Sequence, residues 1–140
     1  SADGLVTARV IAGEAYGVAA KIDTYTPVTL QDWTLQPGGR AQPAPPADQK
    51  MALYLFEGSL AVGPQGRIIN EGQLVIFGDG DNIDLALDAA AGPPARLLLF
   101  GGVPIREPIA RYGPFVMNTG EELRQAFDDY KAGRMGAIAR

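Results

Sequence analysis

Short apolar runs separated by turn residues follow one another along most of the chain. Several runs alternate apolar and polar side chains, a period typical of half-buried strands, and eleven prolines and eighteen glycines break the chain between them. At this short and regular spacing the runs predict an all-β domain built as a sandwich, jelly roll or barrel. We expect strands at Leu5–Ala12, Ile22–Thr26, Thr29–Gln36, Met51–Glu57, Leu60–Val62, Arg67–Asn70, Gln73–Phe77, Ile83–Leu87 and Arg96–Phe100.

Three of the connections carry signals of their own. Gly58-Ser59, directly after Met51–Glu57, predicts a hairpin. Arg40–Asp48 holds three prolines, which cannot donate to a sheet, so we expect an extended loop or an edge segment there. Gly13–Gly17 lacks the G-x-G-x-x-G spacing of a phosphate-binding loop and predicts a turn between the first two strands.

The last part of the chain changes to a helical pattern. Thr119 followed by Glu122 three residues later is typical of a capping box, and Gly133 stands where a C-cap belongs. Between them an apolar stripe recurs at helical spacing, at Leu123, Ala126, Phe127 and Tyr130. These signals predict one amphipathic helix over Gly120–Ala132, with a stripe that packs on the host barrel or docks on a second domain.

Composition narrows the chemistry that the chain can perform. Hydrophobic residues make up 46% of the 140 residues, so disorder is not expected. The net charge is −4 and the chain has no cluster of Lys and Arg, so we expect no direct binding of nucleic acid. No apolar run is long enough to span a bilayer and no signal-peptide pattern is present, so we expect a cytoplasmic protein without a membrane partner. The absence of histidine and cysteine removes the usual ligands of zinc and redox metals.

Two stretches match the glycine framework of the cupin superfamily, G-x5-H-x-H-x3-4-E-x6-G and G-x5-P-x-G-x2-H-x3-N. The framework glycines are Gly39, Gly58, Gly72 and Gly80. The four ligand positions, which hold three histidines and a glutamate in metal-binding cupins, are Pro45, Ala47, Met51 and Ile83 in this chain. We therefore expect a cupin-type double-stranded β-helix (a jelly-roll barrel) with a C-terminal α-helix, in which apolar side chains fill the place of the metal site.

Longer segments resemble the C-terminal cupin domain of the pirin family. They are RVIAGEAYG (Arg9–Gly17), TPVTLQDWTLQPG (Thr26–Gly38), GQLVIFGDGD (Gly72–Asp81), EPIARYGPFVMNT (Glu107–Thr119) and the EELRQAFDDYKAG that follows closely. The resemblance covers nearly the whole chain. It implies a single domain over residues 1–140, with a linker at 1–4, the barrel and a C-terminal loop at 5–118, and the helix at 119–133.

The resemblance also implies a function. Pirins are bicupins, in which the N-terminal cupin domain binds iron or another divalent metal through three histidines and a glutamate and the C-terminal domain carries no metal. This chain would then have no catalytic, cofactor-binding or metal-binding residue, and its partner would be the N-terminal cupin domain of the same protein. The whole protein would be a metal-dependent dioxygenase of the quercetin 2,3-dioxygenase type, or a transcriptional co-regulator.

Other functions stay open at this point. The chain could be a stand-alone cupin that binds a small molecule inside the barrel, or a protein-interaction module that acts through the terminal helix. If the absence of a first domain exposes an apolar face, we expect self-association through that face, and hence a homo-oligomer.

Arg111 and Tyr112 are the candidate contact residues. They precede Gly113-Pro114, and an arginine beside a rigid turn can hold a ligand's carboxylate or a facing domain. The alternative is an arginine that braces its own loop.

The run Gly78–Asn82 (GDGDN) invites comparison with a calcium loop. With Asp79 in the first position of an EF-hand loop, the fifth position is Ile83 and the twelfth is Ala90, and neither offers a side-chain oxygen. A solvated turn between strands is therefore expected.

Overall fold

The structure, a computed structural model, describes residues 1–78, 80 and 82–136. The chain divides into two compact units, Ser1–Pro104 and Ile105–Arg140. We call them the barrel unit and the C-terminal unit, and each is described by itself.

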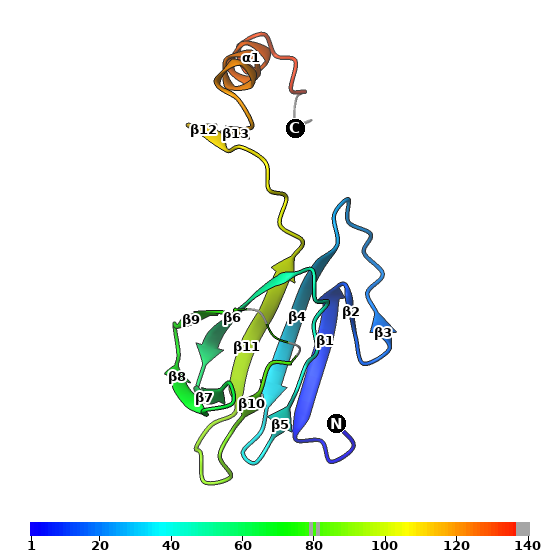
Figure 1. Cartoon of the computed structure of the whole chain (residues 1–140), viewed down its shortest axis with the longest axis vertical. Helices are drawn as coiled ribbons and strands as arrows, with labels where there is room; N and C mark the ends of the chain where they lie inside the picture. The colour runs from blue at the N-terminus through cyan, green and yellow to red at the C-terminus, as the bar shows by residue number, and fades with distance from the viewer. Residues whose placement is uncertain (79, 81, 137–140) are drawn as a thin grey trace. The chain divides into compact units, whose positions relative to one another are not determined.

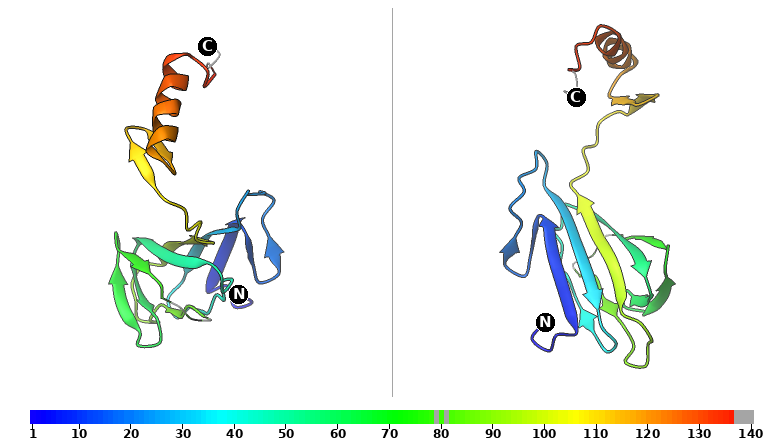
Figure 2. Two further views of the ribbon diagram at one scale, coloured as in Figure 1. Left: turned by 45° about the horizontal axis from the view of Figure 1, so that its top comes forward. Right: turned by 180° about the vertical axis from the view of Figure 1, so that it is seen from behind.

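Two antiparallel sheets face each other in the barrel unit (Figures 1 and 2). The strand order is β1-β4-β11-β6-β9 in the larger sheet and β5-β10-β7-β8 in the smaller one. The larger sheet contains β1 (Val6–Ala12), β4 (Val28–Leu35), β11 (Ala95–Gly102), β6 (Lys50–Glu57) and β9 (Leu74–Ile76). The smaller one contains β5 (Arg40–Ala41), β10 (Leu85–Ala86), β7 (Ser59–Val62) and β8 (Arg67–Asn70).

The core lies between these two sheets. Strand β4 shows the alternation that builds it, since every second residue from Thr29 to Leu35 is buried and the residues between them are half-buried. The buried cluster joins large side chains of both sheets, among them Trp33, Leu53, Leu55, Leu97 and Leu99 from the larger sheet and Leu60, Ile69 and Leu85 from the smaller. Burial of this apolar surface is the main stabilising contribution in the barrel unit. The all-β barrel expected from the sequence is confirmed.

The hairpin expected at Gly58-Ser59 is wrong. Strand β6 belongs to the larger sheet and β7 to the smaller one, so Gly58 is a corner at which the chain crosses between sheets. Gly58 has a φ of +84°, and a Cβ atom there would lie 2.8 Å from the carbonyl oxygen of Pro94. The close approach of a distant loop forms this corner, and local turn residues do not reveal such an approach.

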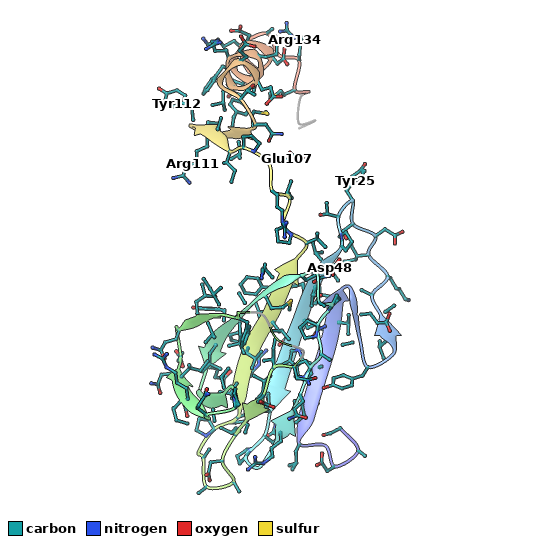
Figure 3. The ribbon with its side chains drawn as sticks, in the orientation of Figure 1. Tyr25, Asp48, Glu107, Arg111, Tyr112 and Arg134 are labelled. Atoms are coloured by element: carbon teal, nitrogen blue, oxygen red, sulfur yellow. The ribbon has the colours of Figure 1, made fainter. Side chains whose placement is uncertain are left out.

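The strand expected at Ile22–Thr26 is also wrong. The segment is a loop, and Tyr25 projects fully exposed from its tip (Figure 3). The Thr24 hydroxyl donates to the carbonyl oxygen of Thr26 at 2.7 Å, a local bond that competes with strand pairing. Pro27 further restricts the backbone of the residue before it. The other expected strands are confirmed, with small differences at their ends.

The segment Gly13–Gly17 forms more than the expected turn. Strands β2 (Glu14–Ala15) and β3 (Val18–Ala19) pair across Tyr16 and Gly17. Both turn residues have positive φ, +50° and +75°, as a two-residue turn of type I′ requires.

The C-terminal unit consists of a hairpin and a helix. Strands β12 (Ala110–Tyr112) and β13 (Phe115–Met117) pair across a two-residue turn, and α1 (Gly120–Lys131) packs on them. The sequence predicted only a loop before the helix, because three-residue strands are too short to show a period. The apolar stripe of α1 therefore meets this hairpin: the Phe127 ring lies 4.9 Å from that of Phe115 and 5.6 Å from that of Tyr112.

Helix α1 begins and ends as the sequence predicts. The Thr119 hydroxyl accepts from the Glu122 amide at 3.2 Å, and the Glu122 carboxylate accepts from the Thr119 amide at 2.9 Å, so the capping box is confirmed. The chain leaves the helix through Gly133, which has a φ of +71°. Over the residues that the structure describes, no helix is long and apolar enough to cross a membrane.

A charged cluster closes the last turn of α1. The Arg134 guanidinium donates to Asp129 Oδ1 at 2.5 Å, and the Gln125 amide donates to the same oxygen at 2.8 Å. The hydrogen bond from Arg134, followed by that from Gln125, lowers the pKa of Asp129 from its ordinary value.

Candidate functional site

The four positions that replace the cupin ligands lie around one cavity. Pro45, Ala47, Met51 and Ile83 all line a cavity of about 330 Å³ in the barrel unit. Residues with polar side chains also line it, namely Gln49, Asn82 and Asp84. The glycine spacing thus identified four positions that line one cavity, although they are up to 38 residues apart in the sequence.

The residues in these positions do not fit a metal ion. Met51 and Ile83 are 4% and 5% exposed and belong to the core, Pro45 is half-buried and Ala47 is exposed. No described residues form a group of three or more His, Cys, Asp or Glu that could hold a metal ion. Asp79 and Asp81 of the GDGDN run lie outside the residues that the structure describes. We therefore derive no metal chemistry from this cavity.

Met51 fits into its position because a glycine faces it. Gly101 of β11 pairs with Met51 of β6. A Cβ atom on Gly101 would collide with the Met51 sulfur and with the Lys50 carbonyl oxygen. The thioether therefore occupies the space above Gly101, and the interior at this ligand position is filled by the protein's own side chain.

A second cavity opens beside β1 and the β2–β3 hairpin. It has a volume of about 700 Å³, and its walls include Val6, Ala8, Val10, Tyr16, Trp33 and Arg40. The Tyr16 ring stands edge-on to that of Trp33, with 6.0 Å between their centroids. The Trp33 indole donates to Gln31 Oε1 at 2.9 Å, and the Gln31 amide donates to the Glu14 carbonyl oxygen at 3.2 Å, so hydrogen bonds hold this wall in place.

The side of the larger sheet that faces away from the core is also apolar; we call it the outer face. Cross-strand pairing aligns its side chains in two rows over β4, β11, β6 and β9, namely Leu30, Phe100, Ala52 and Ile76 in one and Asp32, Leu98, Tyr54 and Leu74 in the other. Leu74 is 55% exposed and Ile76 is 77% exposed. Seven of these eight side chains are apolar or aromatic, whereas the free face of an antiparallel sheet is normally polar.

Asp32 is the polar member of the outer face. Its Oδ2 atom lies 3.7 Å from the Arg9 guanidinium. Its Oδ1 atom is buried and accepts no hydrogen bond from any residue that the structure describes. A buried carboxylate oxygen without a donor is costly, so this atom calls for an explanation.

Arg111 and Tyr112 lie side by side on β12 but point in different directions (Figure 3). Tyr112 contacts the ring of Phe127 on the helix side of the hairpin. Arg111 is exposed on the other side, opposite Val116. Within the described part of the chain Arg111 makes no hydrogen bond or ion pair, so it does not brace its own loop there.

The outer face is the feature that sequence reasoning missed. Its signal was present in β6 (KMALYLFE) and β11 (ARLLLFGG), whose apolar residues run on without a polar alternate. Such unbroken runs are typical of strands that are covered on both sides.

Three comparisons place the chain among known proteins. The family model of the pirin C-terminal cupin domain matches residues 30–136. A pirin-like protein of Solanum lycopersicum is 36% identical over 132 residues, which are 94% of this chain and 45% of that protein. Pirin of Homo sapiens is 34% identical over 138 residues, 97% of this chain and 47% of pirin.

Solved structures share the fold of this chain. A quercetin 2,3-dioxygenase from Acinetobacter baumannii matches with a TM-score of 0.86 and 28% identity, over 98% of this chain and 46% of that one. GK1651 from Geobacillus kaustophilus matches with a TM-score of 0.65 and 30% identity, over 74% of this chain and 42% of that one. The chain spans about half the length of the curated relatives it matches.

Proposed function

The chain belongs to the pirin family as its C-terminal cupin domain, and on that premise we propose that it is a non-catalytic, metal-free cupin that supports a metal-bearing cupin domain. The supported domain would be the N-terminal half of the same protein. This chain would contribute packing to that domain, and the chemistry would take place elsewhere.

The cavity residues support the metal-free part of the proposal. Pro45, Ala47 and Ile83 carry no side-chain donor atom, and the Met51 thioether is engaged in packing over Gly101. A divalent ion of the iron type is bound by imidazole and carboxylate groups, which these positions lack.

The outer face is the observation that carries the supporting role. An antiparallel sheet with one free face alternates apolar and polar side chains, but the central residues of β6 (Met51–Phe56) and β11 (Leu97–Phe100) are apolar or aromatic on both faces. Apolar side chains that are exposed side by side, as Leu74 and Ile76 are, often mark a site of interaction. We infer that a second domain covers the outer face and buries Leu74 and Ile76.

Asp32 fits the same interpretation. Its side chain lies in a row with Leu98 and is 21% exposed, although its Oδ1 atom is closed off within the chain. A hydrogen-bond donor on the covering domain would reach the exposed part of the carboxylate, and a charge-assisted bond at a dry interface is among the stronger polar contacts. Asp32 would thus fix the position of the partner on an otherwise apolar surface.

The proposal assigns the cofactor and any reaction to the partner domain. Iron or another divalent metal would be bound there, and dioxygenase activity of the quercetin 2,3-dioxygenase type, or a co-regulator role, would belong to the whole protein. A cytoplasmic location also stays a prediction.

Two measurements test the proposal together. The first is metal content by mass spectrometry after the chain has been loaded with iron, nickel and zinc, and we expect no stoichiometric metal. The second is binding of the chain to the separately produced N-terminal half. Ile76→Lys should weaken this binding at least about tenfold, because it places a charge in the covered face.

A matched control separates the outer face from general surface effects. Ile22 is another exposed isoleucine, 59% accessible in the loop before β4, and Ile22→Lys should leave the affinity unchanged. One tightly held metal equivalent would overturn the metal-free claim. Equal binding by the two variants would remove the outer face from the interface.

A second candidate function is the binding of a small aromatic molecule beside Trp33. The cavity of about 700 Å³ favours it, since ligand pockets have volumes of roughly 300–1,000 Å³. Trp33 is the single tryptophan of the chain, so its emission reports on this wall directly. A saturable change of emission with quercetin that disappears in Ala8→Phe would support this function, and no change would count against it.

A further inference from the structure

The hairpin of the C-terminal unit has a second face that the helix does not cover. Strand pairing sets Arg111 opposite Val116, and Ile109 precedes Arg111 by two residues. We call these three residues the back face of the hairpin. Ile109 is 80% exposed and Val116 is 64% exposed.

The other face of the hairpin is already occupied. Tyr112 and Phe115, which pair with each other, direct their rings toward Phe127 of α1. Successive side chains of a strand point to opposite faces. Arg111 and Val116 therefore point away from α1, as Figure 3 shows for Arg111.

The C-terminal unit buries little apolar surface. Among its described residues Ala126 is the only buried hydrophobic side chain. Domains below roughly 40 residues usually need a disulfide, a metal or a partner to fold, and this chain has no cysteine. An additional surface would stabilise the packing of the hairpin on the helix.

Arg111 indicates which chemical groups a partner surface must offer to the hairpin. Its guanidinium has no hydrogen bond or ion pair with the described residues, the exposed Val116 lies opposite it, and the exposed Ile109 precedes it by two residues. Arginine pairs with carboxylates through two parallel hydrogen bonds, and its planar group is well suited to interfaces. The matching surface is an apolar patch that contains a carboxylate.

We propose that the back face of the hairpin binds the metal-bearing domain of the same protein, with Arg111 paired to a carboxylate on that domain. This inference rests on the proposed function and adds a second contact to the outer face. The chain spans about half the length of its relatives, so a domain of comparable size is available as the occupant. The barrel unit and the C-terminal unit would each hold that domain by a different surface.

Hydrogen exchange measured by mass spectrometry tests the proposal on the full-length two-domain protein and on the 140-residue chain. Peptides that cover residues 109–117 should exchange at least about tenfold more slowly in the full-length protein, because docking protects the hairpin. Arg111→Ala in the full-length protein should remove most of this protection. Arg111→Lys should keep part of it, since lysine retains the charge but not the two parallel hydrogen bonds.

Arg124→Ala is the matched control in the same unit. Arg124 lies on the outside of α1 and pairs with Glu121 at 3.8 Å, so its loss should leave the exchange of residues 109–117 unchanged. Circular dichroism would verify that Arg111→Ala, an exposed substitution, leaves the helix intact.

Each alternative outcome has a distinct meaning. Equal exchange of residues 109–117 in the chain and in the full-length protein, with protection of β9 only, would overturn this inference and leave the proposed function standing. No protection at either place would overturn both. If the 140-residue chain alone is protected and the protection rises with its concentration, the back face binds a second copy. If that protection does not depend on concentration, the back face makes a contact within the chain. Either outcome would overturn the proposal.

Discussion

The barrel unit and the C-terminal unit bury their apolar side chains to very different extents. The barrel unit closes two sheets around large side chains such as Trp33, Leu55 and Leu97, each at most 1% exposed. The C-terminal unit places one helix on one hairpin and buries only Ala126 among its described hydrophobic residues. The barrel unit thus has a large core of its own, whereas the C-terminal unit has only a small one.

The two units also differ in where their unpaired apolar side chains lie. In the barrel unit, Tyr54, Leu74 and Ile76 lie together on the outer face, and the other exposed apolar side chains are scattered over loops and the smaller sheet. In the C-terminal unit, Val116 lies opposite Arg111 on a short hairpin, and Ile109 precedes that arginine by two residues. Both features indicate association with another domain, and the first would supply area while the second would supply a directed polar contact.

The largest expected difference between the two units is in the effect of a leucine-to-alanine substitution on the free energy of unfolding. Leu97→Ala removes a fully buried side chain and should lower the free energy of unfolding of the barrel unit by about 3 kcal/mol. Leu123→Ala removes a half-buried side chain of α1 and should leave that transition unchanged, because the barrel core does not include it. Urea unfolding followed by Trp33 fluorescence measures both. Similar losses in the two variants would mean that the chain unfolds as one unit and would break the comparison.

Loss of the helix cap should act on the C-terminal unit alone. Thr119→Ala removes the hydroxyl that accepts from Glu122 and should cost about 1 kcal/mol of helix stability. Far-ultraviolet circular dichroism should report less helix, while the Trp33 transition stays in place. The matched variant Thr24→Ala removes a hydrogen bond in a loop of the barrel unit and should leave the helix signal unchanged. A shift of the Trp33 transition in Thr119→Ala would show coupling between the units.

The smallest expected effect is on the pH dependence of the C-terminal unit. Hydrogen bonds from Arg134 and Gln125 lower the pKa of Asp129 in the folded state. These bonds stabilise the last turn of α1 fully when the pH is above the ordinary pKa of the group. The stabilisation is lost as the pH falls through the lowered pKa. Arg134→Gln should raise the pKa of Asp129 toward its ordinary value. Carboxyl chemical shifts measured during a pH titration follow this change.

Asp3 of the barrel unit is the internal control for that titration. Its pKa is lowered by a hydrogen bond from the Ser1 hydroxyl and by another from the Leu5 amide, so it should not respond to Arg134→Gln. An unchanged pKa of Asp129 in the variant would show that Arg134 does not hold the carboxylate in solution.

Prediction from the sequence succeeded where the cause was local or periodic. The capping box and Gly133 predicted the ends of α1 because cap residues act within one helical turn. The apolar and polar pattern predicted β4 as a strand, and the glycine spacing predicted that Met51 and Ile83 lie at one cavity. It failed at Gly58, where the outcome depends on the approach of a loop far away in the sequence, and at Ile22–Thr26, where a local side-chain hydrogen bond competes with strand pairing.

By itself the sequence determined the class of the fold, the one helix with its caps, and the absence of imidazole and thiol ligands, because these follow from side-chain chemistry and short-range periodicity. Only the tertiary structure decided that β6 and β7 belong to different sheets, that the apolar residues of β6 and β11 align into an outer face, and that Arg111 points away from α1. Those features depend on strand pairing between distant segments. Pairing is selected by the burial of the whole core, and no single stretch of the chain contains that information.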